Sequence, residues 1–154
     1  MMSLCCDVLN NLRGKTLATA ESCTGGGIGA ALTAVPGSSE VYKGGVICYT
    51  NWVKCNLLGV DMLLLDKEGA VSASVAEAMA IGVRNRMNAD IAVSVTGLAG
   101  PGGDEYGNPV GLVYIGYADE NVVSSKRFVF SGDRQAVRNA AIKSALTIIL
   151  EHNM

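Results

Sequence analysis

A serine stands directly before a run of glycines near the start of the chain, in the segment Glu21-Ser22-Cys23-Thr24-Gly25-Gly26-Gly27. Largely apolar residues precede the run and small residues follow it, a pattern that predicts a strand, a tight turn and a helix. Such a turn presents the Ser22 hydroxyl and exposes backbone N–H groups at a helix N-terminus, where anions bind. A nucleophile beside an anion site favours an enzyme acting on a phosphorylated or carbonyl-bearing small molecule; the alternative is a purely structural turn.

A serine hydroxyl needs a base to become a nucleophile. The only histidine, His152, is third from the C-terminus and is expected to be frayed, so a Ser-His-Asp triad is not indicated. Lys54 is a candidate base, because with Asn51 as the N-cap of a helix it lies in the first turn, where the helix dipole disfavours a cation. Tyr49 can lend a hydroxyl to the same relay. The alternative for Lys54 is a solvated surface residue.

Two neighbours of Ser22 compete for these roles. Cys23 is a rival nucleophile, because a thiolate at a helix N-terminus is stabilised by the same field. Cysteine is also a commonly buried residue, and no histidine lies nearby in sequence, so Ser22 is preferred. Glu21 is another base candidate, but alternation along a strand points its side chain away from that of Ser22.

A second glycine-rich loop follows an apolar segment, with the sequence Thr96-Gly97-Leu98-Ala99-Gly100-Pro101-Gly102-Gly103. Ligands of open α/β sheets bind at strand ends, so this loop is a candidate binding loop, with a flexible surface loop as the alternative. Arg134 and Arg138 begin the last predicted helix, and their forked donors suit phosphate, although such residues are usually only solvated. The spacing Gly25-x-Gly27-x-x-Ala30 is weak support for NAD, because no acidic residue ends a following strand.

Composition excludes several classes of protein. Of the 154 residues, 49% are hydrophobic and 17% charged, which is typical of a compact globular protein. A net charge of −2 without a basic face argues against nucleic acid as a partner. Five cysteines without CxxC spacing, beside one histidine, argue against a zinc site and for reduced thiols. No apolar run reaches a membrane-spanning length and no signal peptide is evident, so we expect a cytoplasmic protein without a membrane partner.

The periodicity predicts which elements position these residues. A stripe of Val75, Met79, Val83 and Met87 indicates a helix, with Ser74 or Ser72 as its cap. Gly44-Gly45 suggests a bulge or a close backbone approach within a strand. We expect helices at 3–13, from about 24 to before 36, at 51–58, from 74 and after 133, and strands at 15–20, 41–50, 90–96, 110–117 and 122–130. The short connection between the last two strands requires an antiparallel hairpin.

This order of elements predicts a single domain, residues 1–154, in the α/β class. Its architecture is expected to be a three-layer α/β/α sandwich with a mixed sheet of about five to six strands that ends in an antiparallel hairpin.

Several ordered motifs give the chain a resemblance to the CinA C-terminal domain family. They are Glu21-Ser22-Cys23-Thr24-Gly25-Gly26, Tyr49-x-Asn51-x-x-Lys54-x-x-Leu57-Leu58-Gly59-Val60, Val95-Thr96-Gly97-x-Ala99-Gly100-Pro101-Gly102-Gly103, Pro109-Val110-Gly111-x-Val113-Tyr114 and Gly132-Asp133-Arg134-x-x-Val137-Arg138. Active members are nicotinamide mononucleotide (NMN) deamidases of pyridine nucleotide salvage, which release nicotinic acid mononucleotide and ammonia without a metal or other cofactor. Because many members carry a further N-terminal domain, the chain is similar to the stand-alone form.

The resemblance also implies roles for individual residues. Ser22 would be the nucleophile and Lys54 its general base, with Tyr49 assisting. Backbone N–H groups near Thr24 and Gly25 would stabilise the oxyanion. The implied substrate contacts are Thr24, Gly25, Gly26, Thr96 and Gly97, with Arg134 or Arg138 holding the phosphate.

Two other functions stay open at this point. One is a catalytically silent module that binds a pyridine nucleotide; the other is an amidase acting on another phosphorylated amide. Retention of Ser22, Tyr49 and Lys54 together favours activity. The sequence leaves the assembly open, and a homodimer is favoured because it is the commonest assembly.

Overall fold

Five strands form one mixed sheet in the computed structural model, which describes residues 1–154. Its spatial order is β2-β1-β3-β4-β5, in which β1 pairs in parallel with β2 and β3, and β4 pairs antiparallel with β3 and β5. The strands are β1 (Leu17–Glu21), β2 (Tyr42–Ile47), β3 (Ile91–Gly97), β4 (Leu112–Ala118) and β5 (Val123–Val129). The mixed sheet and its closing hairpin are therefore confirmed, with five strands.

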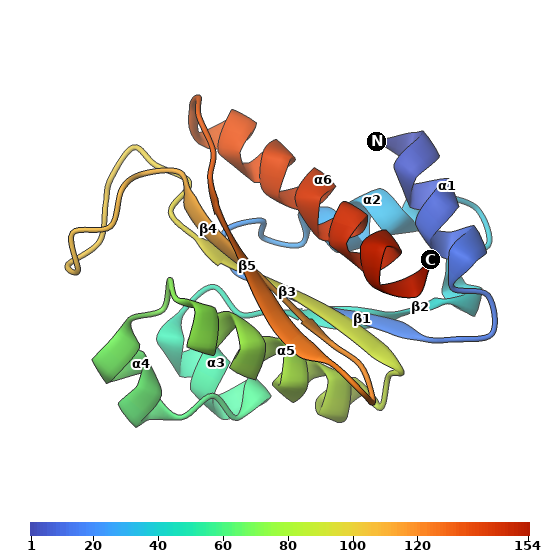
Figure 1. The fold of residues 1–154 in the computed structure, drawn as a ribbon, viewed down its shortest axis with the longest axis horizontal. Helices are drawn as coiled ribbons and strands as arrows, with labels where there is room; N and C mark the ends of the chain where they lie inside the picture. Colours follow the sequence, from blue (N-terminus) through green and yellow to red (C-terminus); the bar gives the residue numbers. More distant parts are fainter.

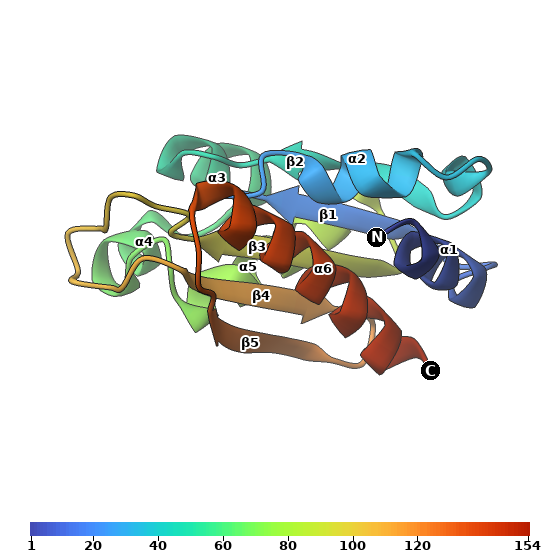
Figure 2. The same cartoon turned by 90° about the horizontal axis from the view of Figure 1, so that it is seen from above.

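Helices cover both faces of this sheet, which confirms the three layers (Figure 1 and Figure 2). On one face α1 (Met2–Asn11), α2 (Gly27–Thr33) and α6 (Arg134–Asn153) enclose a core of 23 buried residues. On the other face α3 (Asn51–Leu58), α4 (Met62–Glu68) and α5 (Ala73–Met87) enclose a second core of 11 residues. A short 3-10 helix, η1 (Ser38–Glu40), leads into β2. None of the helices is both long and apolar enough to cross a membrane.

The parallel strands end at one edge of the sheet, and this edge holds the candidate site. Ser22 follows β1 directly, and its N–H donates to the Val95 carbonyl of β3 at 2.9 Å. On the other side, the Cys48 N–H donates to the Glu21 carbonyl at 2.9 Å. The loop between β3 and β4 leaves this same edge and projects beyond the sheet (Figure 2). The strand order thus brings segments that are far apart in sequence beside Ser22.

The glycines of β2 behave as the sequence suggested. The register between β1 and β2 shifts after Leu17, which pairs with Tyr42 while Ala18 pairs with Gly44. A Cβ on Gly45 would collide with Thr19, lying 2.5 Å from its carbonyl oxygen. Both the bulge and the close backbone approach are therefore present.

Helix starts differ from the sequence expectations. The N-cap of α3 is Thr50, whose hydroxyl accepts from the Val53 N–H, so Asn51 is the first helical residue and not the cap. In α5 the cap is Ser72 and not Ser74. In both cases the capping residue has extended backbone angles, which a cap requires and a helical residue lacks.

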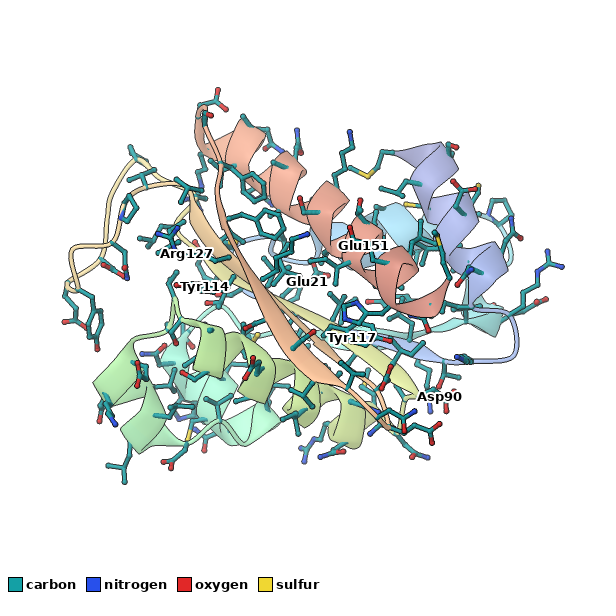
Figure 3. All side chains as sticks on the ribbon, in the orientation of Figure 1. Glu21, Asp90, Tyr114, Tyr117, Arg127 and Glu151 are labelled. Carbon is teal, nitrogen blue, oxygen red and sulfur yellow. The ribbon has the colours of Figure 1, made fainter.

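Two further segments were not anticipated. Helix α4 is short and was missed, although Asp61 caps it by accepting from the Leu63 N–H. The expected fraying at His152 is wrong, because its ring stacks on Tyr117 with the centroids 4.0 Å apart and α6 continues to Asn153. Figure 3 shows Tyr117 beside the last turns of α6.

Candidate active site

The side chains of Ser22 and Lys54 meet on the face of the sheet covered by α3 and α5. The distance from Lys54 Nζ to Ser22 Oγ is 3.0 Å, within hydrogen-bond range. Lys54 Nζ also donates to the Cys48 carbonyl at 2.8 Å. The sequence placed both residues at one site, and the structure brings them into contact because α3 follows β2 directly and lays its first turn over the end of β1.

Lys54 is buried without a counter-charge. Its side chain is 1% exposed, and the one ion pair of the protein joins Lys126 to Glu151 on the surface. Desolvation lowers the pKa of the Lys54 amine from its ordinary value, against a weaker opposing effect of the Cys48 and Cys23 thiols. A lowered pKa increases the fraction of neutral amine, which is the form that accepts a proton from a hydroxyl. The contact between Lys54 and Ser22 therefore joins a candidate base to a candidate nucleophile.

Cys23 is a poorer nucleophile than its place in the sequence suggested. It lines a cavity that Ser22 and Lys54 also line, but it is only 5% exposed. Burial raises the pKa of the Cys23 thiol to about 11, despite the neighbouring Lys54 and Arg138. Very little reactive thiolate exists at neutral pH with that pKa, which leaves Ser22 as the better candidate.

The glycine run builds the turn after Ser22. Gly25 and Gly26 have positive φ values of 58° and 99°, and Gly26 is the N-cap of α2. At Gly27 an added Cβ would lie 2.5 Å from the Ile142 side chain of α6. These glycines therefore allow a left-handed turn and close helix packing, and none of them lines the cavity.

The N-terminus of α2 is occupied by the protein's own carboxylate. Glu21 is 2% exposed, and its side chain lies on the face of the sheet that α2 covers (Figure 3). It accepts from the N–H groups of Ile28 and Gly29 at 2.8 and 3.0 Å, and from the Thr24 hydroxyl at 2.8 Å. The predicted anion site at this helix start is therefore taken, and Glu21 points away from Ser22 as the strand alternation indicated.

A cavity of about 570 Å³ opens beside Ser22 and Lys54. This size fits a small-molecule ligand. Its wall includes several residues that the sequence selected: Ser22, Tyr49, Lys54, Thr96, Gly97 and Arg134. Thr96 is 1% exposed and donates a hydrogen bond from its hydroxyl to the Ala70 carbonyl at 2.7 Å. Its side chain therefore links β3 to the segment before α5.

Tyr49 and Arg134 form a bridge at the mouth of this cavity. The Arg134 guanidinium donates from Nη2 to the Tyr49 hydroxyl at 3.0 Å and from Nη1 to the Gly100 carbonyl at 2.8 Å. Tyr49 is 58% exposed, and its hydroxyl makes no hydrogen bond to Ser22 or Lys54. A guanidinium carries five N–H donors, so Arg134 retains donors for a further anion.

Four of the sequence-selected residues do not line the cavity: Thr24, Gly25, Gly26 and Arg138. Thr24 is fully buried with its hydroxyl on Glu21. Arg138 reaches from α6 to the backbone carbonyls of Cys23 and Thr24, both at 3.1 Å. The structure thus separates the residues of the turn from those of the cavity wall.

Sequence reasoning missed the residues of the β3–β4 loop that close the cavity: Asp104, Glu105 and Tyr106. The Tyr106 hydroxyl donates to the Asp66 carbonyl of α4 at 3.1 Å, and its ring lies over Gly69, where a Cβ would approach it to 2.9 Å. An aromatic residue in an otherwise polar, glycine-rich loop was the one available signal. The loop is therefore docked on α4.

Comparison with known proteins agrees with this architecture. Residues 3–153 match the family model of the CinA C-terminal domain. A CinA-like protein of Thermosynechococcus vestitus is 54% identical over 140 residues, which are 89% of this chain and 34% of that protein. A CinA-like protein of Synechococcus sp. is 48% identical over 151 residues, which are 96% of this chain and 36% of that protein. The chain therefore spans about one third of the length of these relatives.

Solved structures give the same result. The competence/damage inducible protein CihA of Agrobacterium tumefaciens is 38% identical with a TM-score of 0.96, covering 99% of this chain and 95% of that one. A CinA superfamily protein of Klebsiella pneumoniae is 36% identical with a TM-score of 0.95, covering 97% of this chain and 95% of that one. The fold, the ordered motifs and these matches together show that the chain belongs to the CinA C-terminal domain family.

Proposed function

We propose that this protein is an amidohydrolase that converts NMN and water to nicotinic acid mononucleotide and ammonia. The observation that carries the proposal is the 3.0 Å contact between Ser22 Oγ and the buried, uncompensated amine of Lys54 at the edge of the cavity. A neutral lysine beside a serine is a nucleophile–base pair suited to acyl transfer. The resemblance of the ordered motifs to those of NMN deamidases supports this choice of amide.

The reaction begins when Ser22 Oγ bonds to the carboxamide carbon and its proton passes to Lys54 Nζ. The C–N bond then breaks, and the nitrogen leaves as ammonia with the proton from Lys54. Water attacks the acyl carbon while Lys54 takes its proton, and the Ser22 oxygen leaves with that proton. The sum is amide plus water to acid plus ammonia, with Ser22 and Lys54 restored.

The cavity wall supports recognition of a nucleotide. Arg134 retains donors at the mouth, and a guanidinium binds phosphate through paired N–H groups. Among the two arginines that the sequence selected, we therefore assign the phosphate to Arg134. Tyr49, Thr96 and Gly97 belong to the same wall and are assigned to substrate contact.

The test incubates the pure protein with NMN between about pH 6 and 9 and follows ammonia and the acid product. Ser22→Ala is expected to lose about 10³-fold or more in rate while still binding the nucleotide. Ser39→Ala, at an exposed serine of η1, is the matched control. Binding of NMN by the native protein without turnover would support a silent module, and loss of activity in Cys23→Ala but not in Ser22→Ala would identify the thiol as the nucleophile.

A substrate series separates the deamidase from an amidase on another phosphorylated amide. The series compares NMN with nicotinamide riboside, which lacks the phosphate, and with free nicotinamide. We expect NMN to have the highest kcat/KM, because it alone offers an anion to Arg134. Equal turnover of all three compounds would contradict the assignment of a phosphate contact.

A further inference from the structure

Arg138 is tied to the turn that carries Ser22. Its Nε donates to the Cys23 carbonyl and its Nη2 to the Thr24 carbonyl, both at 3.1 Å. The third nitrogen, Nη1, donates to the Gln135 side chain at 3.3 Å. The first turns of α6 lie beside the segment after β1 (Figure 2). All three nitrogens of this side chain are thus engaged within the protein, outside the cavity wall.

Each carbonyl that Arg138 holds also fixes an N–H group. The N–H and C=O of a trans peptide unit point in opposite directions. The Cys23 carbonyl shares its peptide unit with the Thr24 N–H, so that N–H points away from Arg138. The Thr24 carbonyl shares its unit with the Gly25 N–H, which donates to the Ser22 carbonyl at 3.0 Å. The Ser22 carbonyl in turn shares its unit with the Cys23 N–H, so the guanidinium orients two successive N–H groups.

These two N–H groups have no partner in another residue. Neither the Cys23 nor the Thr24 N–H donates to the backbone of another residue, although the two residues are only 5% and 0% exposed. Unpartnered N–H groups are rare in protein interiors, since each loses its hydrogen bonds to water without replacement. The Cys23 N–H directly follows Ser22 and belongs to a residue of the cavity wall, whereas Thr24 is fully buried outside that wall. The N–H of the residue after a nucleophilic serine is a common donor to the oxyanion of acyl transfer.

We propose that Arg138 is a positioning residue that holds the Cys23 N–H group toward the oxyanion formed when Ser22 is acylated. The inference rests on the proposed function for the chemistry of Ser22, and it gives Arg138 a role other than binding phosphate. Removing an oxyanion donor typically costs 10²–10³-fold in kcat, and displacement of the donors costs less. Arg138→Met is therefore expected to lower kcat about 10–100-fold and to leave KM for NMN within about 3-fold.

The primary experiment measures the reactivity of Ser22 without any amide substrate. A fluorophosphonate probe reacts when Ser22 Oγ bonds to phosphorus, fluoride leaves with the electrons of the P–F bond, and Lys54 accepts the hydroxyl proton. The phosphoryl oxygen of the probe then occupies the oxyanion position. Labelling of Ser22, followed by intact mass, is expected to slow about 10–100-fold in Arg138→Met. Lys143→Met, which removes an exposed cation from the same helix, is the matched control and should label at the native rate.

Two further variants keep the test informative. Arg138→Lys keeps the stem and the charge but cannot hold two carbonyls as a fork, so we expect an intermediate labelling rate even if Arg138→Met folds poorly. Added guanidinium ion should partly restore labelling of Arg138→Ala. A native labelling rate in Arg138→Met, together with a raised KM for NMN but not for the riboside, would overturn the proposal and assign Arg138 to the phosphate.

Failure of the proposed function gives a different pattern. If the native protein labels at Ser22 but does not deamidate NMN, the substrate is wrong, and the ratio of labelling rates still decides the role of Arg138. If the native protein does not label at all, Ser22 is not an activated nucleophile and both proposals fail.

Discussion

Two buried charged side chains flank the turn at Ser22, and they sit in opposite kinds of environment. On the α2 face the Glu21 carboxylate accepts from two backbone N–H groups and two hydroxyls, those of Thr24 and, at 3.4 Å, Thr19. On the α3 face the Lys54 amine contacts only Ser22 Oγ and the Cys48 carbonyl. Both residues are nearly inaccessible, at 2% and 1% exposure. The two residues are therefore about equally buried, but four hydrogen-bond donors compensate Glu21 and no counter-charge compensates Lys54.

This difference assigns the two residues to different tasks. Four donors replace the water that Glu21 loses, so its burial stabilises the turn and the start of α2. Lys54 loses its water without a counter-charge, and this desolvation lowers the pKa of its amine. A buried group that lacks compensation is costly for folding and useful for proton transfer. Glu21 thus holds the turn from one side, and Lys54 is the candidate base on the other.

The largest effect is expected from removing the Lys54 amine. Lys54→Met should reduce deamidation about 10³-fold, the order of magnitude of a lost general base, while the free energy of unfolding stays the same or rises because an unpaired buried amine is replaced by an apolar side chain. Steady-state assays and urea unfolding measure the two quantities. Partial recovery of the rate at high pH would show that Lys54 is not the essential base.

A change at Glu21 should instead affect the free energy of unfolding more than the rate of deamidation. Glu21→Gln replaces one acceptor oxygen by an NH₂ group that faces existing donors, so we expect a loss of about 2–4 kcal/mol in the free energy of unfolding. Urea denaturation measures it, with Glu40→Gln at an exposed position of η1 as control. An unfolding free energy equal to that of the native protein would contradict a structural role for the carboxylate.

The lowered pKa of Lys54 also predicts how the free energy of unfolding depends on pH. The pKa of Lys54 is lowered in the folded protein, so between that pKa and 10.5 the unfolded chain binds a proton that the folded protein does not. The contribution of Lys54 to the free energy of unfolding therefore rises with pH across that window. The stability advantage of Lys54→Met over the native protein should shrink as the pH rises, as measured by urea unfolding from neutral pH upward. A constant difference would show that the pKa is not lowered.

The smallest effect is expected in the β3–β4 loop, whose contact with α4 joins two uncharged groups, the Tyr106 hydroxyl and the Asp66 backbone carbonyl. Tyr106→Phe removes the hydroxyl that donates to the Asp66 carbonyl, a neutral hydrogen bond worth about 1 kcal/mol. We expect KM for NMN to rise roughly 3–6-fold with kcat unchanged, because about 1 kcal/mol corresponds to that ratio. The control is Tyr114→Phe, because the Tyr114 hydroxyl makes no hydrogen bond and Tyr114 lies outside the cavity wall. An unchanged KM would mean that the loop does not depend on this contact.

Local patterns were sufficient for much of the fold. In the predicted stripe Val75, Met79 and Val83 are buried and Met87 is partly buried, because the helical period directly encodes which side faces the core. The antiparallel hairpin followed from the length of its connection. Helix starts were less predictable, since Thr50 and Ser72 each compete with a neighbouring residue that has an equally suitable side chain for capping.

Residue types and short-range spacing were enough to predict the class of fold, most of the elements other than α4, and the side chains available for chemistry. Ser22 and Lys54 came into one hypothesis because their types and local positions suit a nucleophile and a base. Their catalytic roles stay predictions. Glu21 was set aside from sequence by the alternation along its strand, which is a local property.

The partners of each of these groups follow from how the helices and strands pack in three dimensions. Whether α2 offers its first N–H groups to a ligand depends on Glu21, and whether Arg138 faces the cavity depends on how α6 packs over β3 and β4 and against α2. Such contacts join residues up to 115 positions apart. They follow from the packing of whole elements, and no short-range period or spacing encodes them. The desolvation of Lys54 has the same origin, because burial of its amine requires helices and strands from distant parts of the chain.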